Sequence, residues 1–183
     1  MNWIVAGLPL LLLPLSVVAD ETKTIIEDLK VNLQEGTWKD VTALVKESTG
    51  KVVVVDLWST SCLPCVEEFP HLVKLQKQHK ENLVGVSFNL DYAGIRSKPP
   101  TYYRPRVEKF LKKEKAELHN FLSTDEAIEV MDALDILSIP AVYVYDKSGK
   151  LVKRFDESTL KDGEDKAFTY EKDINPLVEK LLN

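Results

Sequence analysis

Runs of consecutive apolar residues mark the strands expected in this chain. Residues 51–58 (KVVVVDLW) are rich in valine and almost continuously apolar, which is typical of a strand covered on both faces of a parallel sheet. A second run over 82–89 predicts another such strand, and 120–122 a short one. Two more runs, 141–145 and 151–155, are separated by Asp-Lys-Ser-Gly-Lys, which predicts a β-hairpin with glycine in its turn.

Amphipathic periodicity fills most segments between these strands. It predicts helices over 38–48, 62–80, 106–115, from Thr124 or Asp125 to about Leu134, and over 174–182. In the fourth helix, Ile128 and Met131 are expected to face the core. Residues 91–105, with three prolines and three tyrosines, and the charged residues 156–170 are expected to be loops. The mixed composition of 20–36 leads to no assignment.

The resulting order of elements is α-β-α-β-α-β-α-β-β-α. Parallel βαβ units followed by a hairpin and a last helix predict an α/β fold with a central mixed sheet between two layers of helices. The sequence shows no internal repeat and no low-complexity segment.

The first nineteen residues have a different character from the rest. Residues 3–18 are nearly all apolar, and no charged side chain precedes Asp20. This run is short of the roughly 20 residues that cross a bilayer, and it ends in Val-Val-Ala, small residues of the kind that signal peptidase reads. We therefore expect 1–19 to be a signal peptide, with an uncleaved membrane anchor as the alternative. Residues 20–37 are expected to be an N-terminal extension, and 38–183 the folded domain.

Composition limits the functional classes. An apolar fraction of 44% allows a substantial core, and a formal net charge of -5 lacks the basic character of a nucleic-acid-binding protein. There are only two cysteines, which are too few for a scaffold held together by disulfides. The cysteines are thus expected to serve chemistry rather than folding.

The two cysteines form the motif Cys62-Leu63-Pro64-Cys65. Residues three apart lie next to each other across one helical turn, and the expected Cα separation of roughly 5–6 Å suits a disulfide. Cys62 is expected at the helix N-terminus, where unpaired backbone N–H groups and the helix dipole stabilise a thiolate. Cys65, one turn further, is expected to be shielded and to resolve a mixed disulfide.

Two other interpretations of the motif remain open. A CxxC pair can supply half of a structural zinc site, but such a site needs four ligands and the sequence has no second pair. His71, His79 and His119 do not have the spacing of a metal-binding pair, so no metal or cofactor is expected. Two inert buried thiols are the other alternative.

Several segments resemble a known family. Residues 55–65 (VDLWSTSCLPC) resemble the active-site segment of thioredoxins, and 66–70 (VEEFP) look like the continuation of that helix in the exported TlpA/ResA-type branch. Ile-Pro at 139–140 and the turn at 146–150 are similar to the C-terminal half of that branch. The resemblance covers roughly 38–183 and implies a thioredoxin fold.

The resemblance also implies roles for individual residues. Asp56 matches the buried acid that exchanges a proton with the resolving Cys65, although a solvated carboxylate at a strand end is the alternative. Trp58 matches the tryptophan packed beside the motif, or it is ordinary core. Pro140 matches the cis-proline that faces the disulfide formed with Cys62.

The sequence departs from the family at several positions. Ser61 stands where an aromatic residue usually precedes the first cysteine. Leu-Pro at 63–64 is not the commonest pair between the cysteines, and in the family this pair tunes the reduction potential. Glu67 and Glu68 are expected on a solvated helix face, with tuning of the site as the alternative. The tyrosines of 91–105 could line a substrate groove or lie on ordinary surface.

The function implied by the resemblance is reduction of protein disulfides outside the cytoplasm, of the kind that supports cytochrome c maturation. Its partners would be protein thiols and disulfides and a membrane thiol-transfer protein that donates electrons. Three alternatives stay open: an oxidant that donates disulfides, a peroxidase, and a module that binds partners without turnover. The peroxidase is disfavoured because Ser59 stands where peroxiredoxins carry threonine.

Overall fold

The computed structural model describes residues 31–157 and 168–183. The predicted signal peptide or anchor at 1–19 lies outside these residues, as does most of the loop predicted at 156–170. The elements run in the order β1 Leu33–Gly36, α2 Trp38–Glu47, β2 Val52–Trp58, α3 Leu63–Gln78, β3 Leu83–Asn89, α4 Pro100–Glu114, β4 His119–Ser123, α5 Ala127–Ala133, β5 Ala141–Tyr145, β6 Leu151–Phe155, the π-helical turn η2 Tyr170–Ile174 and α6 Asn175–Leu182. Among the described residues, no helix combines the length and apolar character needed to cross a membrane.

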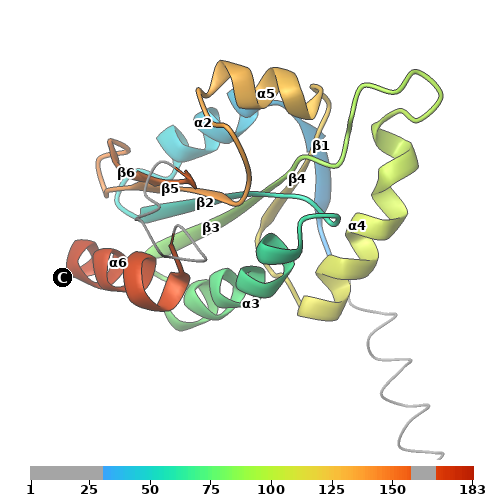
Figure 1. Ribbon diagram of the computed structural model, residues 1–183. Coiled ribbons are helices and arrows are strands. Elements are labelled where there is room, and N and C mark those ends of the chain that lie inside the picture. The colour runs from blue at the N-terminus through green and yellow to red at the C-terminus, as the bar shows by residue number, and fades with distance from the viewer. Residues whose placement is uncertain (1–30, 158–167) are drawn as a thin grey trace, which may run out of the picture. The chain divides into compact units, whose positions relative to one another are not determined.

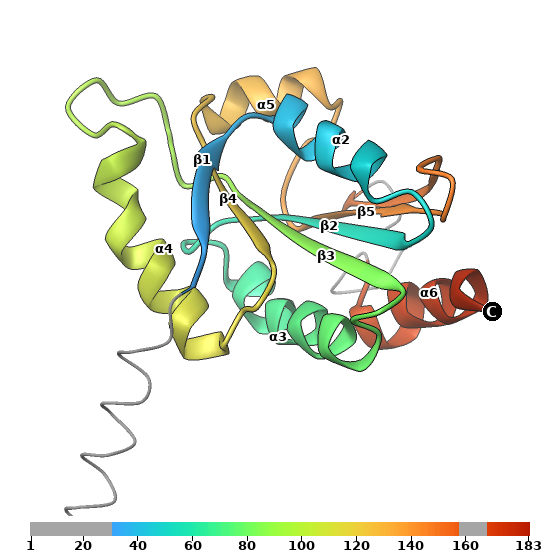
Figure 2. The same ribbon diagram turned by 180° about the vertical axis from the view of Figure 1, so that it is seen from behind.

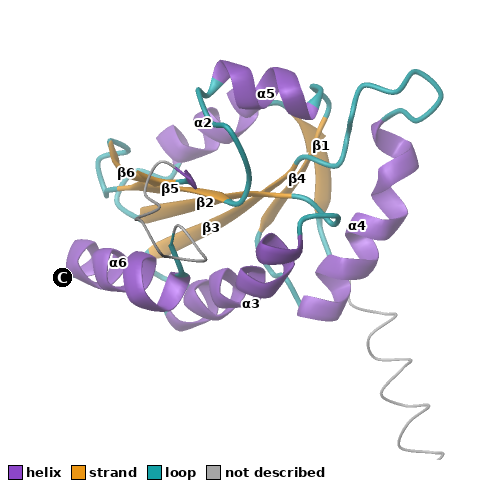
Figure 3. Cartoon of the chain, in the orientation of Figure 1, coloured by secondary structure: helices purple, strands orange, loops and turns teal. Residues whose placement is uncertain are grey.

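The strands form one mixed sheet with the order β1-β4-β3-β2-β5-β6. β1, β4, β3 and β2 run parallel to one another, whereas β5 is antiparallel to both β2 and β6. Helices α2 and α5 cover one face, and α3, α4 and α6 cover the other (Figures 1 and 3). The predicted three-layer α/β arrangement is confirmed.

Strand β2 lies in the middle of the sheet and contributes to both halves of the core. Val52, Val54 and Trp58 pack among the residues of α3, α4 and α6, while Val53 and Val55 pack among those of α2 and α5. Successive side chains of a strand point to opposite faces. This alternation places the side chain of Asp56 on the face of the sheet that α3 covers.

The first strand was not assigned from sequence. Figure 2 shows β1 at the edge of the sheet, beside β4. Its four residues, Leu-Gln-Glu-Gly, are buried only at Leu33 and Gly36, and the two polar residues between them are exposed. Such a short edge strand has no apolar alternation to detect. The N-terminal extension predicted at 20–37 therefore adds a strand to the sheet in its described part.

The sequence-based prediction was wrong for the start of α4 and for the buried side of α5. Helix α4 begins at Pro100, six residues before the predicted start, and continues through Pro105. Proline in a helix removes one hydrogen bond, but Tyr103, Val107 and Leu111 recur on one face and are buried, so packing outweighs that loss. In α5 the prediction for Ile128 was also wrong.

The error in α5 concerns which side of the helix is buried. Ile128 is 57% exposed, whereas Val130 is buried and Met131 is packed against the core. The helix begins at Ala127 and has only seven residues. Such a short helix buries one side chain fully, and the sequence pattern placed this position two residues too early.

Candidate active site

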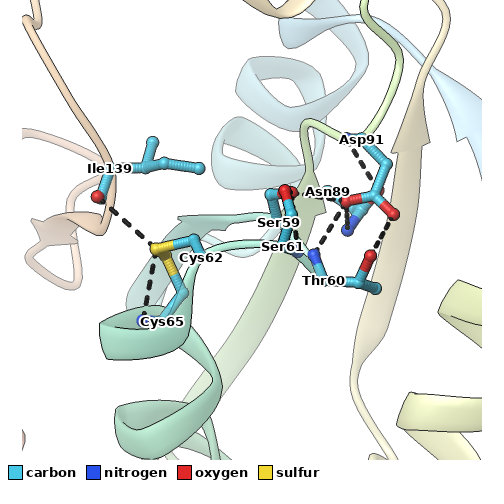
Figure 4. The surroundings of a disulfide bond; sticks show 8 residues. All are labelled: Ser59, Thr60, Ser61, Cys62, Cys65, Asn89, Asp91 and Ile139. Carbon is cyan, nitrogen blue, oxygen red and sulfur yellow. Dashed lines mark hydrogen bonds between the residues drawn. A yellow bond between two sulfur atoms is a disulfide. The ribbon is translucent and has the colours of Figure 1, made fainter.

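The two cysteines lie at the start of α3 and are joined by a disulfide (Figure 4). Their Cα atoms are 5.3 Å apart, as expected for residues separated by one helical turn. Cys62 is the N-cap residue of α3, and Pro64 occupies the first turn, where a missing N–H costs nothing. The chain from β2 through a three-residue turn therefore delivers Cys62 to the helix N-terminus.

The two sulfur atoms have different surroundings. Cys65 is 2% exposed, whereas Cys62 is only partly buried. The backbone N–H of Cys65 donates to Sγ of Cys62 at 3.3 Å, and the same sulfur lies 3.5 Å from the carbonyl oxygen of Ile139. In the reduced protein this N–H stabilises a thiolate on Cys62. The geometry supports an outer attacking sulfur and an inner resolving sulfur.

Pro140 follows directly after the carbonyl group that faces Cys62. The Ile139–Pro140 peptide bond is cis, as the family resemblance implies. β5 begins at the next residue, so this bond lies immediately before the start of a strand that pairs with β2. The sheet therefore holds the proline segment and the cysteine segment side by side.

Asp56 lies within the core rather than in solvent. It is 2% exposed and lies on the face of β2 that packs against α3. Its Oδ2 accepts a hydrogen bond of 2.8 Å from the hydroxyl of Tyr170. Its Oδ1 is buried and accepts no hydrogen bond from the described part of the chain. The alternative of a solvated carboxylate is therefore excluded.

This burial changes the acidity of Asp56. Removal from water raises the pKa of the Asp56 carboxyl to about 7, against the opposing effect of the hydrogen bond from Tyr170, and the negative charge of Glu68 raises it further. Burial and the charge of Asp56 raise the pKa of Tyr170 well above its usual value, so the phenol stays protonated and remains a donor. Asp56 can consequently take up or release a proton near neutral pH.

Asp56, Glu68 and Tyr170 form one buried group, and the sequence did not predict the places of Glu68 and Tyr170. Glu68 is 8% exposed, and its Oε2 accepts a hydrogen bond of 3.0 Å from the backbone N–H of Tyr170. The expectation of a solvated face holds for Glu67, which is exposed, but is wrong for Glu68. Tyr170 fell in a predicted loop, and its only signal was an aromatic residue just ahead of an amphipathic helix.

Trp58 is completely buried beneath the motif. Its ring packs against Phe69 and Phe110 at centroid distances of 4.7 and 4.8 Å, and its Nε1 donates to the hydroxyl of Ser87 at 2.9 Å. Phe69 belongs to α3, so Trp58 packs against the helix that carries both cysteines. It thereby supports the position of that helix on the sheet.

We expect Trp58→Phe to lower the free energy of unfolding by about 2–4 kcal/mol, through the lost ring volume and the unpaired hydroxyl of Ser87. Chemical denaturation of the oxidised protein measures this loss. A double-mutant cycle with Ser87→Ala is the control. Because the double variant has no unpaired partner, its loss should be smaller than the sum of the two single losses; strict additivity would contradict the role of the hydrogen bond.

The turn that precedes Cys62 is bound to Asp91 at the end of β3 (Figure 4). Asp91 is 5% exposed, and its Oδ1 accepts hydrogen bonds from the Ser59 hydroxyl and the Thr60 backbone N–H, both at 2.7 Å. Its Oδ2 accepts from the Thr60 hydroxyl at 2.6 Å and from Nε of Arg106 at 2.7 Å. Nothing local in the sequence distinguishes Asp91 from an ordinary loop aspartate, so its role could not be predicted.

The histidines do not join this site as ligands. His71 stacks on the ring of Tyr170 at 6.3 Å, and His79 pairs with Glu179. Across residues 31–157 and 168–183, no three His, Cys, Asp or Glu side chains are grouped as metal ligands.

Several known proteins with similar sequences are named thiol-disulfide oxidoreductases. The chain is 27% identical over 109 residues to the thiol-disulfide oxidoreductase ResA of Halalkalibacterium halodurans, which covers 60% of the chain and 56% of that protein. It is 30% identical over 105 residues to ResA of Bacillus subtilis, covering 57% of the chain and 52% of that protein. The chain thus spans about half the length of the curated relatives it matches.

Solved structures agree on the fold. A putative thiol:disulfide interchange protein DsbE from Chlorobium tepidum superposes with a TM-score of 0.53 at 20% identity, over 75% of this chain and 84% of that one. The thioredoxin domain of a thiol-disulfide oxidoreductase from Bacteroides vulgatus also has a TM-score of 0.53, at 21% identity, over 75% and 83%. These likenesses establish the predicted thioredoxin-like fold.

The family assignment rests on a match over most of the described domain. Residues 28–170 match the Redoxin family, a range that includes both cysteines, Asp56, Pro140 and Tyr170. The similarity to ResA proteins agrees with the TlpA/ResA-type resemblance of the sequence. The chain belongs to the Redoxin family.

Proposed function

We propose that this protein is a thiol–disulfide oxidoreductase that reduces disulfides in other proteins. The observation that carries the proposal is the unequal exposure of a bonded CxxC pair at a helix N-terminus, with Cys62 reachable and Cys65 buried. A structural disulfide needs no such asymmetry. Two successive exchange reactions do, because the first sulfur must reach a partner and the second must be kept from it.

The proposed reaction starts from the reduced pair. The Cys62 thiolate attacks one sulfur of the substrate disulfide, forms a mixed disulfide and releases the other substrate sulfur as a thiolate, which takes up a proton. Cys65 then loses its proton and attacks Sγ of Cys62. The substrate leaves as a dithiol, and Cys62 and Cys65 are left oxidised by two electrons in the bonded state seen here.

Asp56 is the proposed base for the second step. Cys65 is buried, and burial makes a thiol harder to ionise. A carboxylate with a pKa near 7 is matched to taking a proton from such a thiol at neutral pH. Its Oδ1, which receives no hydrogen bond from the described residues, is the oxygen open to that proton.

The proposed setting is outside the cytoplasm. The apolar residues 1–19 have the pattern of a signal peptide or membrane anchor. The ResA-like sequence supports a role in keeping cysteines of apocytochrome c reduced, with electrons supplied by a membrane thiol-transfer protein. In this role the protein takes two electrons from the donor per substrate disulfide reduced.

The reduction potential of the Cys62–Cys65 pair tests the proposed direction. We expect a value near or below that of thioredoxin, roughly −270 mV, when the full chain is equilibrated with glutathione or dithiothreitol buffers. A value near that of the oxidant DsbA, roughly −120 mV, would reverse the direction of electron flow. A protein that is fully reducible but does not reduce insulin would be a binding module, which would contradict catalysis.

A further inference from the structure

We propose that Asp91 is a positioning residue that holds the Ser59–Ser61 turn and thereby keeps the Cys62 sulfur in place for attack. The inference rests on the proposed function, since it concerns the same sulfur atom. It extends the site to the end of β3 and to helix α4, neither of which carries a cysteine. Asp91 does not contact the reacting atoms and acts through the turn.

Asp91 binds the turn at three points. Both carboxylate oxygens accept hydrogen bonds from it: Oδ1 from the Ser59 hydroxyl and the Thr60 N–H, and Oδ2 from the Thr60 hydroxyl. Because Asp91 is almost fully buried, these bonds are shielded from competing water. Three bonds from two consecutive residues leave the turn little freedom to rotate.

Asp91 is itself bound by Asn89 and Arg106, which lie outside the turn. Asn89 donates from Nδ2 to Oδ1 at 3.3 Å and accepts from the backbone N–H of Asp91 at 3.0 Å. Arg106 donates to Oδ2 from α4, and its guanidinium lies over the ring of Tyr103 at 4.9 Å. The carboxylate therefore joins a strand end, a helix and the active-site turn.

The turn controls the sulfur through a short length of chain. The N–H of Cys62 donates to the carbonyl of Ser59 at 3.1 Å, and the hydroxyls of Ser59 and Ser61 lie 2.8 Å apart. Sγ of Cys62 meets the N–H of Cys65 only while Cys62 keeps its N-cap conformation. Displacement of the turn therefore moves the sulfur away from the group that stabilises its thiolate.

Ser61 is the exposed residue that directly precedes Cys62. A serine has no ring that could fix the turn by packing. Hydrogen bonds to the buried carboxylate of Asp91 supply the restraint.

The test removes the two hydroxyls of the turn that donate to Asp91, those of Ser59 and Thr60, without changing charge. In the variant Ser59→Ala/Thr60→Val, Asp91 keeps its bonds from the Thr60 N–H, Asn89 and Arg106, so the fold is retained. We expect alkylation of Cys62 by iodoacetamide in the reduced full chain, located by mass spectrometry, to slow about fivefold at pH 7. The midpoint of its pH profile should move to higher pH.

The matched control lies on the opposite face of the sheet. Thr37→Val/Thr42→Val also removes two side-chain hydroxyls, one of which donates to the carboxylate of Asp40 at 2.8 Å and the other to the carbonyl of Lys39. It loses an N-cap and is destabilised by about 1 kcal/mol, yet should keep the wild-type alkylation rate. Equal rates in wild type and in the turn variant would overturn the proposal, as would an equal slowing in the control.

A second pair of variants tests the connection to α4. Arg106→Gln leaves the Asp91 charge without its cation, and we expect about threefold slower alkylation. Arg104→Gln, on the same helix, removes ion pairs to Glu35 and Glu108 away from the turn and should change nothing. Equal slowing in both would contradict a specific role of Arg106.

Alkylation requires no disulfide substrate, so these results are independent of the proposed function. If the protein failed to reduce insulin while the turn variant still slowed alkylation, the function would be wrong and the positioning role would stand. If insulin reduction succeeded and alkylation were unchanged, the positioning role alone would be wrong.

Discussion

Cys62→Ser is expected to abolish disulfide reduction completely, and Cys65→Ser to stop it after the first step. Without Cys62 no exposed sulfur is left to attack, because Cys65 is 2% exposed. Without Cys65 the mixed disulfide forms but cannot be resolved. Insulin reduction should fall to background in both variants, and only Cys65→Ser should accumulate a covalent complex on a non-reducing gel.

The control for this pair of variants is their fold. Serine is close to cysteine in size, so both variants should keep the far-ultraviolet circular dichroism of the reduced protein. Equal residual activity in the two variants would contradict the division of roles. A complex trapped by Cys62→Ser instead of Cys65→Ser would reverse the assignment of the attacking sulfur.

Asp56 should make the stability of the oxidised protein fall as the pH rises. Its pKa is raised to about 7 in the folded state from 3.8, so the folded protein holds a proton that the unfolded chain has already lost. The associated stability is fully present below pH 3.8 and is lost as the pH rises through 7. Between pH 5 and pH 8 this group alone should lower the free energy of unfolding by about 2–3 kcal/mol.

Asp56→Asn isolates this contribution. Asparagine cannot ionise, and its side-chain oxygen can still accept from Tyr170. Groups remote from Asp56 titrate alike in both proteins, and Tyr170 stays protonated between pH 5 and pH 8. The measured quantity is therefore the change in free energy of unfolding from pH 5 to pH 8 in wild type minus that in the variant, obtained by urea denaturation. Parallel pH dependence in the two proteins would falsify the raised pKa of Asp56.

The same variant should slow the chemistry. If Asp56 accepts the proton of Cys65, Asp56→Asn will delay release of the mixed disulfide without affecting alkylation of Cys62. Trapped complex should then appear transiently in a protein that still has both cysteines. Slow release with normal alkylation would distinguish the role of Asp56 as base from the role of Cys62 as attacking sulfur.

Local signals in the sequence were sufficient to predict the central strand of the fold and the place of the two cysteines at a helix start. The valine run of 51–58 indicated a strand buried on both faces, and the CxxC motif directly after it indicated a helix start. The cis geometry of Pro140 came from the family resemblance, since nothing in Ser-Ile-Pro-Ala itself distinguishes the two isomers.

Contacts between distant segments could not be predicted in this way. Tyr170 meets Asp56 and Glu68 across 114 and 102 residues, and Asp91 meets Thr60 across 31. A strand that is apolar on both faces does not reveal which face its single aspartate takes. Sheet order and helix placement decide that, and a pattern of apolar residues along one segment contains neither.

The position of Tyr170, far along the chain from the cysteines, has a consequence for protein processing. Tyr170 is contributed by η2, which leads into the C-terminal helix α6, while the cysteines and Asp56 are more than a hundred residues earlier. A chain cut before Tyr170 keeps the complete CxxC motif but loses the hydroxyl that donates to Oδ2 of Asp56. Proteolysis near the C-terminus would therefore disturb the proposed proton transfer without touching either cysteine.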